Sequence, residues 1–210
     1  MISRILLHWS LEMKKQKKSK LNLKVKILSG LWKGKNITFL DKEDLRPTKN
    51  IIRETLFNWI QEDVKDSVCL DLFAGSGVLG FEAASRGARK VYMIDVDTDI
   101  TNQLSTQKKE LNANNVYIFN SSAFSFLKNL KENFNLIFLD PPFSKEIINE
   151  TIRKLSLMTE ISDKCKIYIE LPYKKNYELM LETPVNWNLL KSKKTGEVAY
   201  LLFQHNASMV

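Results

Sequence analysis

Cysteine and histidine are scarce in this sequence, with two of each in 210 residues. Cys69 and Cys165 stand in apolar stretches typical of strands, and their spacing fits neither a disulfide framework nor a metal site. His8 and His205 stand alone, which argues against catalysis or ligation by histidine. We therefore expect two buried thiols, no metal site and a reducing, cytoplasmic location.

Long apolar runs are absent too. No stretch reaches the roughly 20 apolar residues that a membrane helix needs, and Ile2–His8 is too short for a signal peptide. Hydrophobic residues still make up 44% of the chain, which is ample for a core. The length of 210 residues predicts one domain with at most a small appendage. We expect a monomer that contacts no membrane.

Acidic residues are missing mainly from the beginning of the chain. Residues 1–35 hold ten basic residues and one acidic residue, a charge of +9, which leaves −1 for the rest of the net +8. A basic arm is commonly a solvated tail, but this density favours contact with nucleic acid. We expect residues 1–20 to form a disordered extension.

Residues 21–45 are expected to form a β-hairpin and a linker. Leu21–Leu28 alternates apolar and basic side chains, as a half-exposed strand does, and Asn36–Leu40 indicates the second strand. The loop between them carries Trp32 among lysines, which suits stacking on RNA bases as well as contact with phosphates.

A helix is predicted from about Lys49 to Gln61, with its apolar residues on one face. Thr48 precedes it, where a side-chain hydroxyl commonly caps a helix. Arg53 lies off the apolar face. It is either a solvated residue or a partner for the neighbours of Glu54, or it is a contact to a phosphate or a cofactor carboxylate, and the sequence leaves these alternatives open.

From Val68 onward, predicted strands and helices alternate. This order predicts an α/β fold with a mainly parallel sheet of seven strands, covered on both faces and ending in an antiparallel edge pair. The strands are predicted near Val68–Leu72, Lys90–Asp95, Val116–Asn120, Leu136–Leu139, Lys166–Glu170, Trp187–Ser192 and Val198–Gln204. The helices are predicted near Gly77–Arg86, Ile100–Asn112, Ala123–Leu130 and Lys145–Leu157.

The first strand of this series leads into a glycine turn and a helix. Gly75 and Gly77 allow a tight turn and close approach of the backbone to a ligand, and the helix start offers unpaired N–H groups. Together with Gly80 they also match the dinucleotide-binding pattern, which is weak evidence by itself. Asp71 stands just before the glycines, where an acid suits a cationic group such as an ammonium.

Polar residues follow successive predicted strands, namely Asp71, Asp95, Ser122 and Asp140. Ligands of such sheets bind beyond the carboxyl ends of the strands, so we expect these side chains to face one crevice. Asp95 lies where a carboxylate can accept both ribose hydroxyls.

The expected occupant of this crevice is S-adenosylmethionine. Ser122 and the backbone of Ala123 can bind the adenine edge, with Phe124 or Val96 packing on its faces. The glycine turn would approach the methionine part. This cofactor carries its reactive methyl group on a sulfonium, so the protein need only position it.

The tetrapeptide Asp140-Pro141-Pro142-Phe143 closes another strand. Its prolines fix the backbone, so the Asp140 carboxylate and the Pro141 carbonyl can hold an exocyclic amine and aim its lone pair at the methyl group. Such positioning can contribute up to ~7–11 kcal/mol, and stacking of Phe143 on the base about 1–3 kcal/mol. Alone the tetrapeptide is an ordinary strand-ending turn. Paired with the glycine motif, it indicates methyl transfer to a nucleobase nitrogen.

These motifs make the chain resemble the RsmD family of Rossmann-like class I methyltransferases over roughly residues 22–204. The resemblance rests on five groups of residues in order. They are Lys26-Ile27-Leu28-Ser29-Gly30 with Trp32-Lys33-Gly34-Lys35; Arg46-Pro47-Thr48; Arg53-Glu54-Thr55-Leu56-Phe57-Asn58-Trp59; Asp71-Leu72-Phe73-Ala74-Gly75-Ser76-Gly77; and Asp140-Pro141-Pro142-Phe143.

The resemblance implies a methyltransferase domain over residues 46–210 that methylates N2 of a guanine, guanine 966, in the 16S rRNA of the small ribosomal subunit. It implies roles for three groups of residues. Cofactor binding falls to Asp71, Phe73, Ala74, Gly75, Ser76, Gly77, Asp95, Val96, Ser122 and Ala123. Catalysis falls to Asp140, Pro141 and Phe143. RNA binding falls to Lys26, Trp32, Lys33, Lys35, Arg46, Thr48 and Arg53.

Three other functions remain open from the residues alone. The same tetrapeptide serves DNA adenine-N6 methylation, although that activity expects an additional target-recognition segment. A non-catalytic RNA-binding assembly factor would need no acid at position 140. A nicotinamide-dependent oxidoreductase is the weakest alternative, because hydride transfer has no use for the tetrapeptide.

Overall fold

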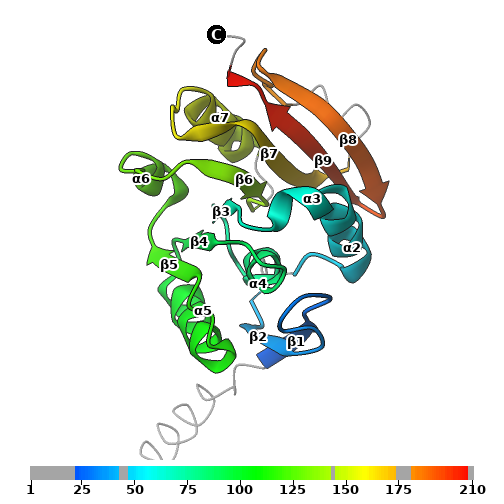
Figure 1. Cartoon of the computed structure of the whole chain (residues 1–210), viewed down its shortest axis with the longest axis vertical. Coiled ribbons are helices and arrows are strands. Elements are labelled where there is room, and N and C mark those ends of the chain that lie inside the picture. Colours follow the sequence, from blue (N-terminus) through cyan, green and yellow to red (C-terminus); the bar gives the residue numbers. More distant parts are fainter. Residues whose placement is uncertain (1–21, 43–46, 143–144, 174–180, 208–210) are drawn as a thin grey trace, which may run out of the picture.

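The structure is a computed structural model that describes residues 22–42, 47–142, 145–173 and 181–207. The expected extension at residues 1–20, together with Arg46 and Phe143, lies outside the described residues. Within them a seven-stranded sheet is covered by helices on both faces, and a two-stranded hairpin packs beside it (Figure 1).

The sheet has the strand order β5-β4-β3-β6-β7-β9-β8. The first five of these strands are parallel, and β9 runs antiparallel to both β7 and β8. The predicted parallel sheet with an antiparallel edge pair is therefore confirmed. The strands are β3 (Val68–Asp71), β4 (Lys90–Asp95), β5 (Val116–Asn120), β6 (Phe134–Leu139), β7 (Ile161–Pro172), β8 (Trp187–Thr195) and β9 (Val198–His205).

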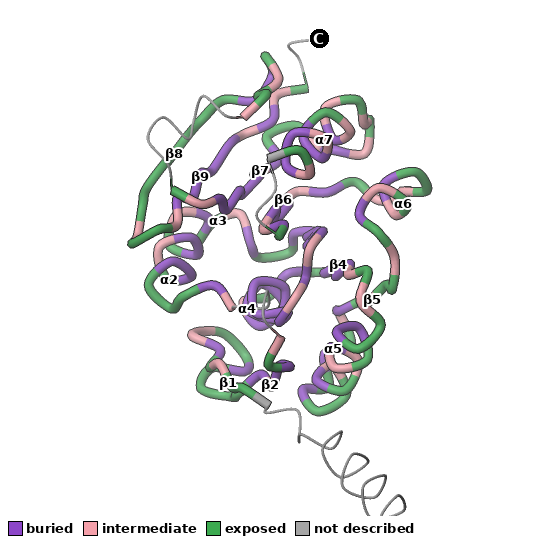
Figure 2. The backbone as a smooth tube through the Cα atoms, turned by 180° about the vertical axis from the view of Figure 1, so that it is seen from behind, coloured by how far each residue is buried: buried purple, intermediate pink, exposed green. Residues whose placement is uncertain are grey.

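Helices cover the two faces of the sheet over two separate apolar clusters. The hairpin, α2, α4 and α5 contribute to one cluster, and α6 and α7 to the other. Figure 2 shows α4 and the central strands buried, while β8 is largely exposed. The helices are α2 (Asn50–Trp59), α3 (Gln61–Val64), α4 (Val78–Ser85), α5 (Thr98–Leu111), α6 (Ala123–Leu127) and α7 (Lys145–Ser156).

The region before β3 differs from its prediction. The single helix expected from Lys49 to Gln61 is divided at Ile60, where the backbone leaves helical geometry between α2 and α3. The predicted capping role of Thr48 is wrong, since Lys49 is the N-cap residue of α2 and no side chain caps that end. Thr48 is instead buried beside the strand ends.

The hairpin consists of β1 (Asn22–Lys26) and β2 (Asn36–Leu40), paired antiparallel. Its loop packs on the last turn of α4, because the Trp32 N–H donates to Ser85 Oγ at 2.9 Å and the Leu31 N–H to the Ser85 carbonyl at 2.7 Å. Gly30 has φ +82°, and a Cβ there would lie 1.9 Å from the same carbonyl oxygen. The close approach therefore requires glycine.

Both cysteines are buried and free, as predicted. Among the described residues there is no group of three or more histidine, cysteine, aspartate or glutamate side chains that could hold a metal ion. No helix in the part of the chain that the structure describes has the length and apolar character needed to cross a membrane.

Candidate active site

The predicted site residues meet at the carboxyl edge of the sheet. Asp71 is the last residue of β3 and pairs in register with Met93 on one side and Phe138 on the other. Asp95 follows Met93 by two positions, and Asp140 follows Phe138 by two positions. The negative charges of both aspartates act on Asp71. The three acids thus come together at the carboxyl edge of the sheet, as the strand order predicts for a switch point.

The glycine turn is tied to β4. Ala74 donates its N–H to the Ile94 carbonyl at 2.9 Å, and Gly75 donates to Asp95 Oδ2 at 2.9 Å. Gly75 and Gly77 have φ of +50° and +76°, in the left-handed region. A Cβ on Gly77 would lie 2.4 Å from Leu104 of α5, so this glycine is needed for internal packing and not only for approach to a ligand.

Asp71 is a buried acid with no cationic partner among the described residues. Its side chain is 2% exposed and accepts hydrogen bonds from the backbone of Gly80 and Phe73. Burial raises its pKa to about 8, and the charges of Asp140 and Asp95 add to the rise. A cationic ligand would reverse this effect and favour the ionised form.

Asp95 connects the glycine turn to the loop after β4. Besides the bond from Gly75, its Oδ1 accepts the N–H of Asp97 at 2.9 Å. A carboxylate offers about four acceptor positions, so two are left for a ligand such as a ribose. Burial raises the pKa of Asp95, and the two backbone N–H groups oppose that rise.

Two side chains on the predicted adenine side already have protein partners. Ser122 Oγ accepts the N–H of Ser125 at 3.1 Å and so caps α6, and the Phe124 ring lies 5.2 Å from the Lys154 ammonium. Val96 is 72% exposed. It is therefore the freer apolar surface for a flat ring, while Ser122 keeps its own hydroxyl proton to donate.

Asp140 stands opposite a second acid that the sequence reasoning missed. Glu170 of β7 is buried and accepts the Tyr168 hydroxyl at 2.9 Å. Burial raises its pKa well above the ordinary value, and the charge of Asp140 adds to the effect. The available signal was its position, since Glu170 closes the predicted strand Lys166–Glu170 at the carboxyl edge of the sheet.

Thr48 lies between these two acids, because its side chain acts on both carboxyls and lowers the pKa of Asp140 and that of Glu170. A hydroxyl has one proton to donate, so with both carboxyls ionised only one of them would receive it. Burial raises the pKa of Asp140 to about 7, and the bond with Thr48 opposes that rise. The pair is therefore suited to holding and releasing one proton near neutral pH.

Of the other residues of the tetrapeptide, the structure describes the two prolines. Pro141 is buried and Pro142 is exposed. Asp140 as a whole residue is partly exposed, although burial of its carboxyl raises its pKa.

Two predicted RNA-binding residues lie in the interior instead. Trp32 is 5% exposed within the core cluster that contains α4. Arg53 is fully buried, with its guanidinium 3.2 Å from Glu82, 3.0 Å from the Lys26 carbonyl and 2.6 Å from Asn50 Oδ1. The burial of Arg53 contradicts the solvated alternative, and its guanidinium is used in holding the hairpin to α2 and α4.

The predicted RNA-binding lysines lie away from the three acids. Lys26, Lys33 and Lys35 are exposed, but the hairpin loop that carries Lys33 packs on the last turn of α4, the end that lies farther from the carboxyl ends of the strands. Thr48 is buried against the two acids and lines the site itself.

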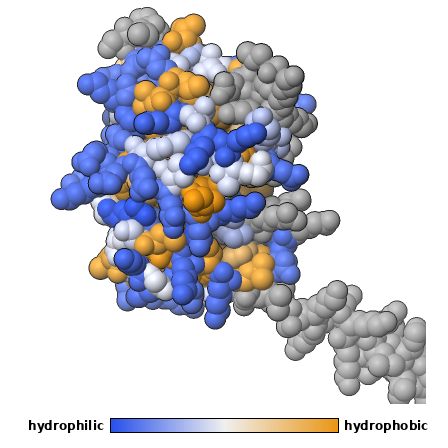
Figure 3. Space-filling model, turned by 90° about the vertical axis from the view of Figure 1, so that its right-hand side faces the viewer, coloured by the Kyte–Doolittle hydropathy of each residue, from blue (hydrophilic) through white to orange (hydrophobic). Residues whose placement is uncertain are grey.

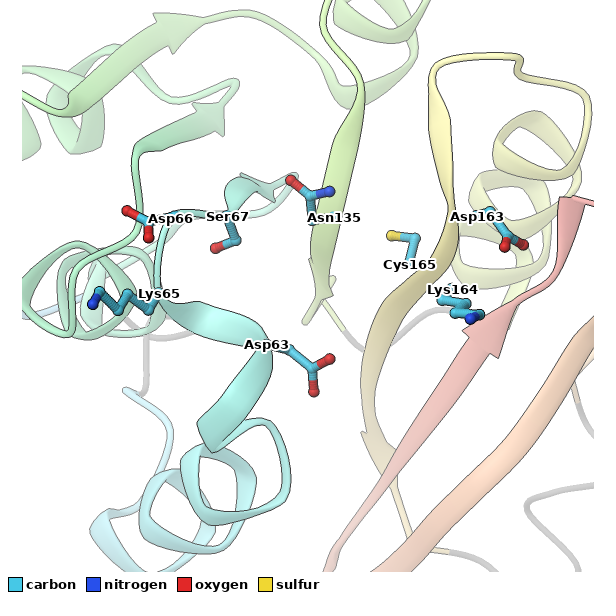
Figure 4. Close-up of a pocket in the computed structure, with 8 residues that line it drawn as sticks. All are labelled: Asp63, Lys65, Asp66, Ser67, Asn135, Asp163, Lys164 and Cys165. Carbon is cyan, nitrogen blue, oxygen red and sulfur yellow. The ribbon is translucent and has the colours of Figure 1, made fainter.

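A cavity of about 290 Å³ lies at the opposite edge of the sheet (Figure 4). Its lining comes from α3, from the segment before β3 and from the first residues of β6 and β7, among them Asp63, Lys65, Asn135 and Lys164. Since ligands of parallel sheets bind at the carboxyl ends, this cavity is separate from the candidate site.

The strand order and the acidic strand ends around a glycine turn define the class I methyltransferase fold. The solved structure described as putative methyltransferase yhhF from Escherichia coli matches with a TM-score of 0.80 and 38% identity, over 88% of this chain and 99% of that one. An RNA methyltransferase from Salinibacter ruber in complex with S-adenosyl-L-homocysteine matches with a TM-score of 0.60 at 14% identity, over 79% of this chain and 97% of that one, and shows the shared fold alone.

The chain belongs to the RsmD family, whose model, described as Conserved hypothetical protein 95, matches residues 25–204. The protein named Ribosomal RNA small subunit methyltransferase D from Escherichia coli (strain K12) is 39% identical over 183 residues, which cover 87% of this chain and 91% of that protein. The protein of the same name from Haemophilus influenzae is 40% identical over 185 residues, covering 86% and 94%.

Proposed function

We propose that this protein transfers the methyl group of S-adenosylmethionine to the exocyclic N2 of a guanine in the 16S rRNA of the small ribosomal subunit. The observation that carries the proposal is the meeting of Asp71, Asp95 and Asp140 at one edge of the sheet, beside the glycine turn. Family membership and the names of the relatives support an rRNA substrate.

The residues at this edge of the sheet fit the cofactor. A buried acid with a raised pKa, Asp71, suits a ligand that brings positive charge, and S-adenosylmethionine carries both an ammonium and a sulfonium. Asp95 would accept the ribose hydroxyls, and Val96 would pack on the adenine. When bound, the cofactor supplies an electrophilic methyl group.

Asp140 and the Pro141 carbonyl would hold the guanine amine by its two N–H groups. The nitrogen lone pair that Asp140 and Pro141 orient would form the new N–C bond as the S–C bond breaks, with its electron pair left on sulfur. The methylated nitrogen would then carry one proton too many, and Asp140, which would hold one of its N–H groups, would accept it. A pKa of about 7 lets Asp140 take that proton and release it again at neutral pH.

The guanine must leave its stack, or already lie in a loop, to reach Asp140. Phe143 follows Asp140 by three positions and would stack on the extruded base. Stacking of this kind contributes about 1–3 kcal/mol per base.

The test compares the wild type with Asp140→Ala on small subunits from cells that lack the enzyme. We expect tritiated methyl incorporation by the wild type, N2-methylguanosine in the digested rRNA by mass spectrometry, and near-complete loss in the variant with cofactor binding largely kept. Asp66→Asn is the matched control, because Asp66 has φ +60° at the opposite edge of the sheet and asparagine tolerates that backbone.

Three outcomes would overturn the proposal. Full activity of Asp140→Ala would remove the catalytic assignment. Methylation of duplex DNA in preference to small subunits would indicate the adenine-N6 reaction instead. Binding of small subunits by the wild type without any methyl transfer would indicate a non-catalytic assembly factor.

A further inference from the structure

Strand β8 at the edge of the sheet carries an exposed basic surface. Its residues from Asn188 to Lys194 are all exposed, including Lys193 and Lys194. Neither of these lysines, nor Lys49 before α2, forms a salt bridge with a described acidic residue. Figure 3 looks onto the side of the molecule that carries α2 and β8, and shows hydrophilic residues interspersed with hydrophobic ones.

The turn between β8 and β9 lies at the catalytic edge. Val198 pairs with Pro172 at the carboxyl end of β7 and with Thr195 at the end of β8. The Tyr173 N–H donates to the Glu197 carbonyl in this turn at 2.7 Å. The lysines near the turn therefore lie on the same edge of the sheet as the candidate site.

The strand register fixes how far Lys193 is from the acids. Lys193 pairs with Tyr200, and Tyr200 pairs with Glu170. Paired residues point to the same face, and adjacent strands lie about 4.8 Å apart, which separates the backbones of Lys193 and Glu170 by about 10 Å. A long lysine side chain on that face can reach the phosphates next to a base held at Asp140.

An aromatic ring lies beside Lys194, which points to the opposite face of the sheet from Lys193 because successive residues of a strand alternate. The Lys194 ammonium sits 4.2 Å from the centre of the Tyr173 ring, which belongs to a residue that is 37% exposed. The Lys49 ammonium lies 3.7 Å from the place that a Cβ of Gly196 would occupy in the turn. Basic and aromatic groups from both faces thus border the same turn at this edge of the sheet, and such groups suit single-stranded RNA, which offers both phosphates and bases that stack.

We propose that Lys49, Tyr173, Lys193 and Lys194, the rim patch, bind the RNA strand on either side of the target guanine. This inference rests on the proposed function for its substrate, and it gives the RNA a contact that the buried Trp32 and Arg53 cannot supply. The hairpin tip lies at the far end of α4, whereas the rim patch adjoins the acids. The rim patch is therefore placed to orient the target base.

The experiment measures small-subunit binding and methyl transfer for the double variant Lys193→Ala/Lys194→Ala and for Tyr173→Ala. Each lysine that contacts a phosphate contributes about 0.7 to 0.9 to the slope of log K against log salt concentration. We expect the double variant to lower that slope by about 1.4 to 1.8 and to raise KM for small subunits about tenfold or more. Cofactor affinity should not change. Tyr173→Phe should keep the stacking that Tyr173→Ala loses.

The matched control is Lys65→Ala/Lys164→Ala, which removes two lysines at the opposite edge of the sheet. An unchanged salt slope and KM in the Lys193/Lys194 variant, equal to those of the control, would overturn the rim patch while leaving the methyltransferase proposal intact. Absence of methyl transfer by the wild type would overturn the proposed reaction, and the binding slopes would still decide whether the rim patch contacts RNA.

Discussion

Replacement of Asp71 by asparagine should make the cofactor-free protein more stable at alkaline pH while weakening its ligand binding. Asparagine is close in size and keeps an acceptor oxygen for the N–H groups of Phe73 and Gly80. The substitution removes the negative charge of the carboxylate, which burial makes unfavourable. The substitution therefore isolates the free energy of holding an ionised carboxylate at the end of β3.

The magnitude follows from the pKa of Asp71. It rises from the ordinary 3.8 to about 8 in the folded protein, and each pKa unit corresponds to about 1.4 kcal/mol. Because the folded state binds this proton more tightly than the unfolded state, stability falls as the pH rises through the interval between the two pKa values. Above pH 8 the ionised group costs about 5 to 6 kcal/mol.

The assay is urea unfolding of both proteins without cofactor across that pH range. We expect similar stabilities near pH 4 and a gap in favour of Asp71→Asn that widens up to about pH 8. Calorimetric titration with S-adenosylmethionine should show the opposite order, with affinity at least about tenfold lower in the variant, equivalent to about 1.4 kcal/mol. Stability curves that run parallel at all pH values would refute the reasoning.

Two further predictions concern buried acids. Glu170→Gln leaves Asp140 as the only carboxyl that competes for the single hydroxyl proton of Thr48, a contact that lowers the pKa of Asp140. The acidic limb of the pH–rate profile should therefore move to lower pH, and an unmoved limb would separate Glu170 from the reaction. Glu82→Gln leaves the buried Arg53 guanidinium without its counter-charge and should destabilise the protein by about 3–5 kcal/mol in urea unfolding. The exposed Glu54→Gln serves as its control, and a similar small loss in both would contradict the pairing.

Local patterns predicted the core of the fold. Between Val68 and Leu139 the length and periodicity of the apolar runs distinguish strands from helices. The predicted bounds of β3, β4, β5 and β6 lie within two residues of those in the structure. Strand-end positions then brought Asp71, Asp95 and Asp140 together, because a parallel sheet gathers its carboxyl ends on one edge.

Contacts between distant segments could not be predicted in this way. Trp32 stands in a loop, where no periodicity says which way a side chain points, and its burial depends on docking against Ser85. Arg53 and Glu82 pair across 29 positions, and on a helix a charged residue off the apolar face normally indicates solvent. The hairpin covers that side of α2, which turns an apparently exposed position into an interior one.

Two buried acids in this molecule show how structural and functional charges differ. Glu82 is fully buried, and its carboxylate is met by the guanidinium groups of Arg53 and Arg86 at 3.2 and 2.8 Å. Asp71 is almost as buried, but the nearest charges acting on it are the carboxylates of Asp140 and Asp95. An uncompensated buried acid is expensive for a fold. Its presence is understandable where a cationic ligand completes the site, so the acid that destabilises the free protein is the one that should contribute most to holding the cofactor.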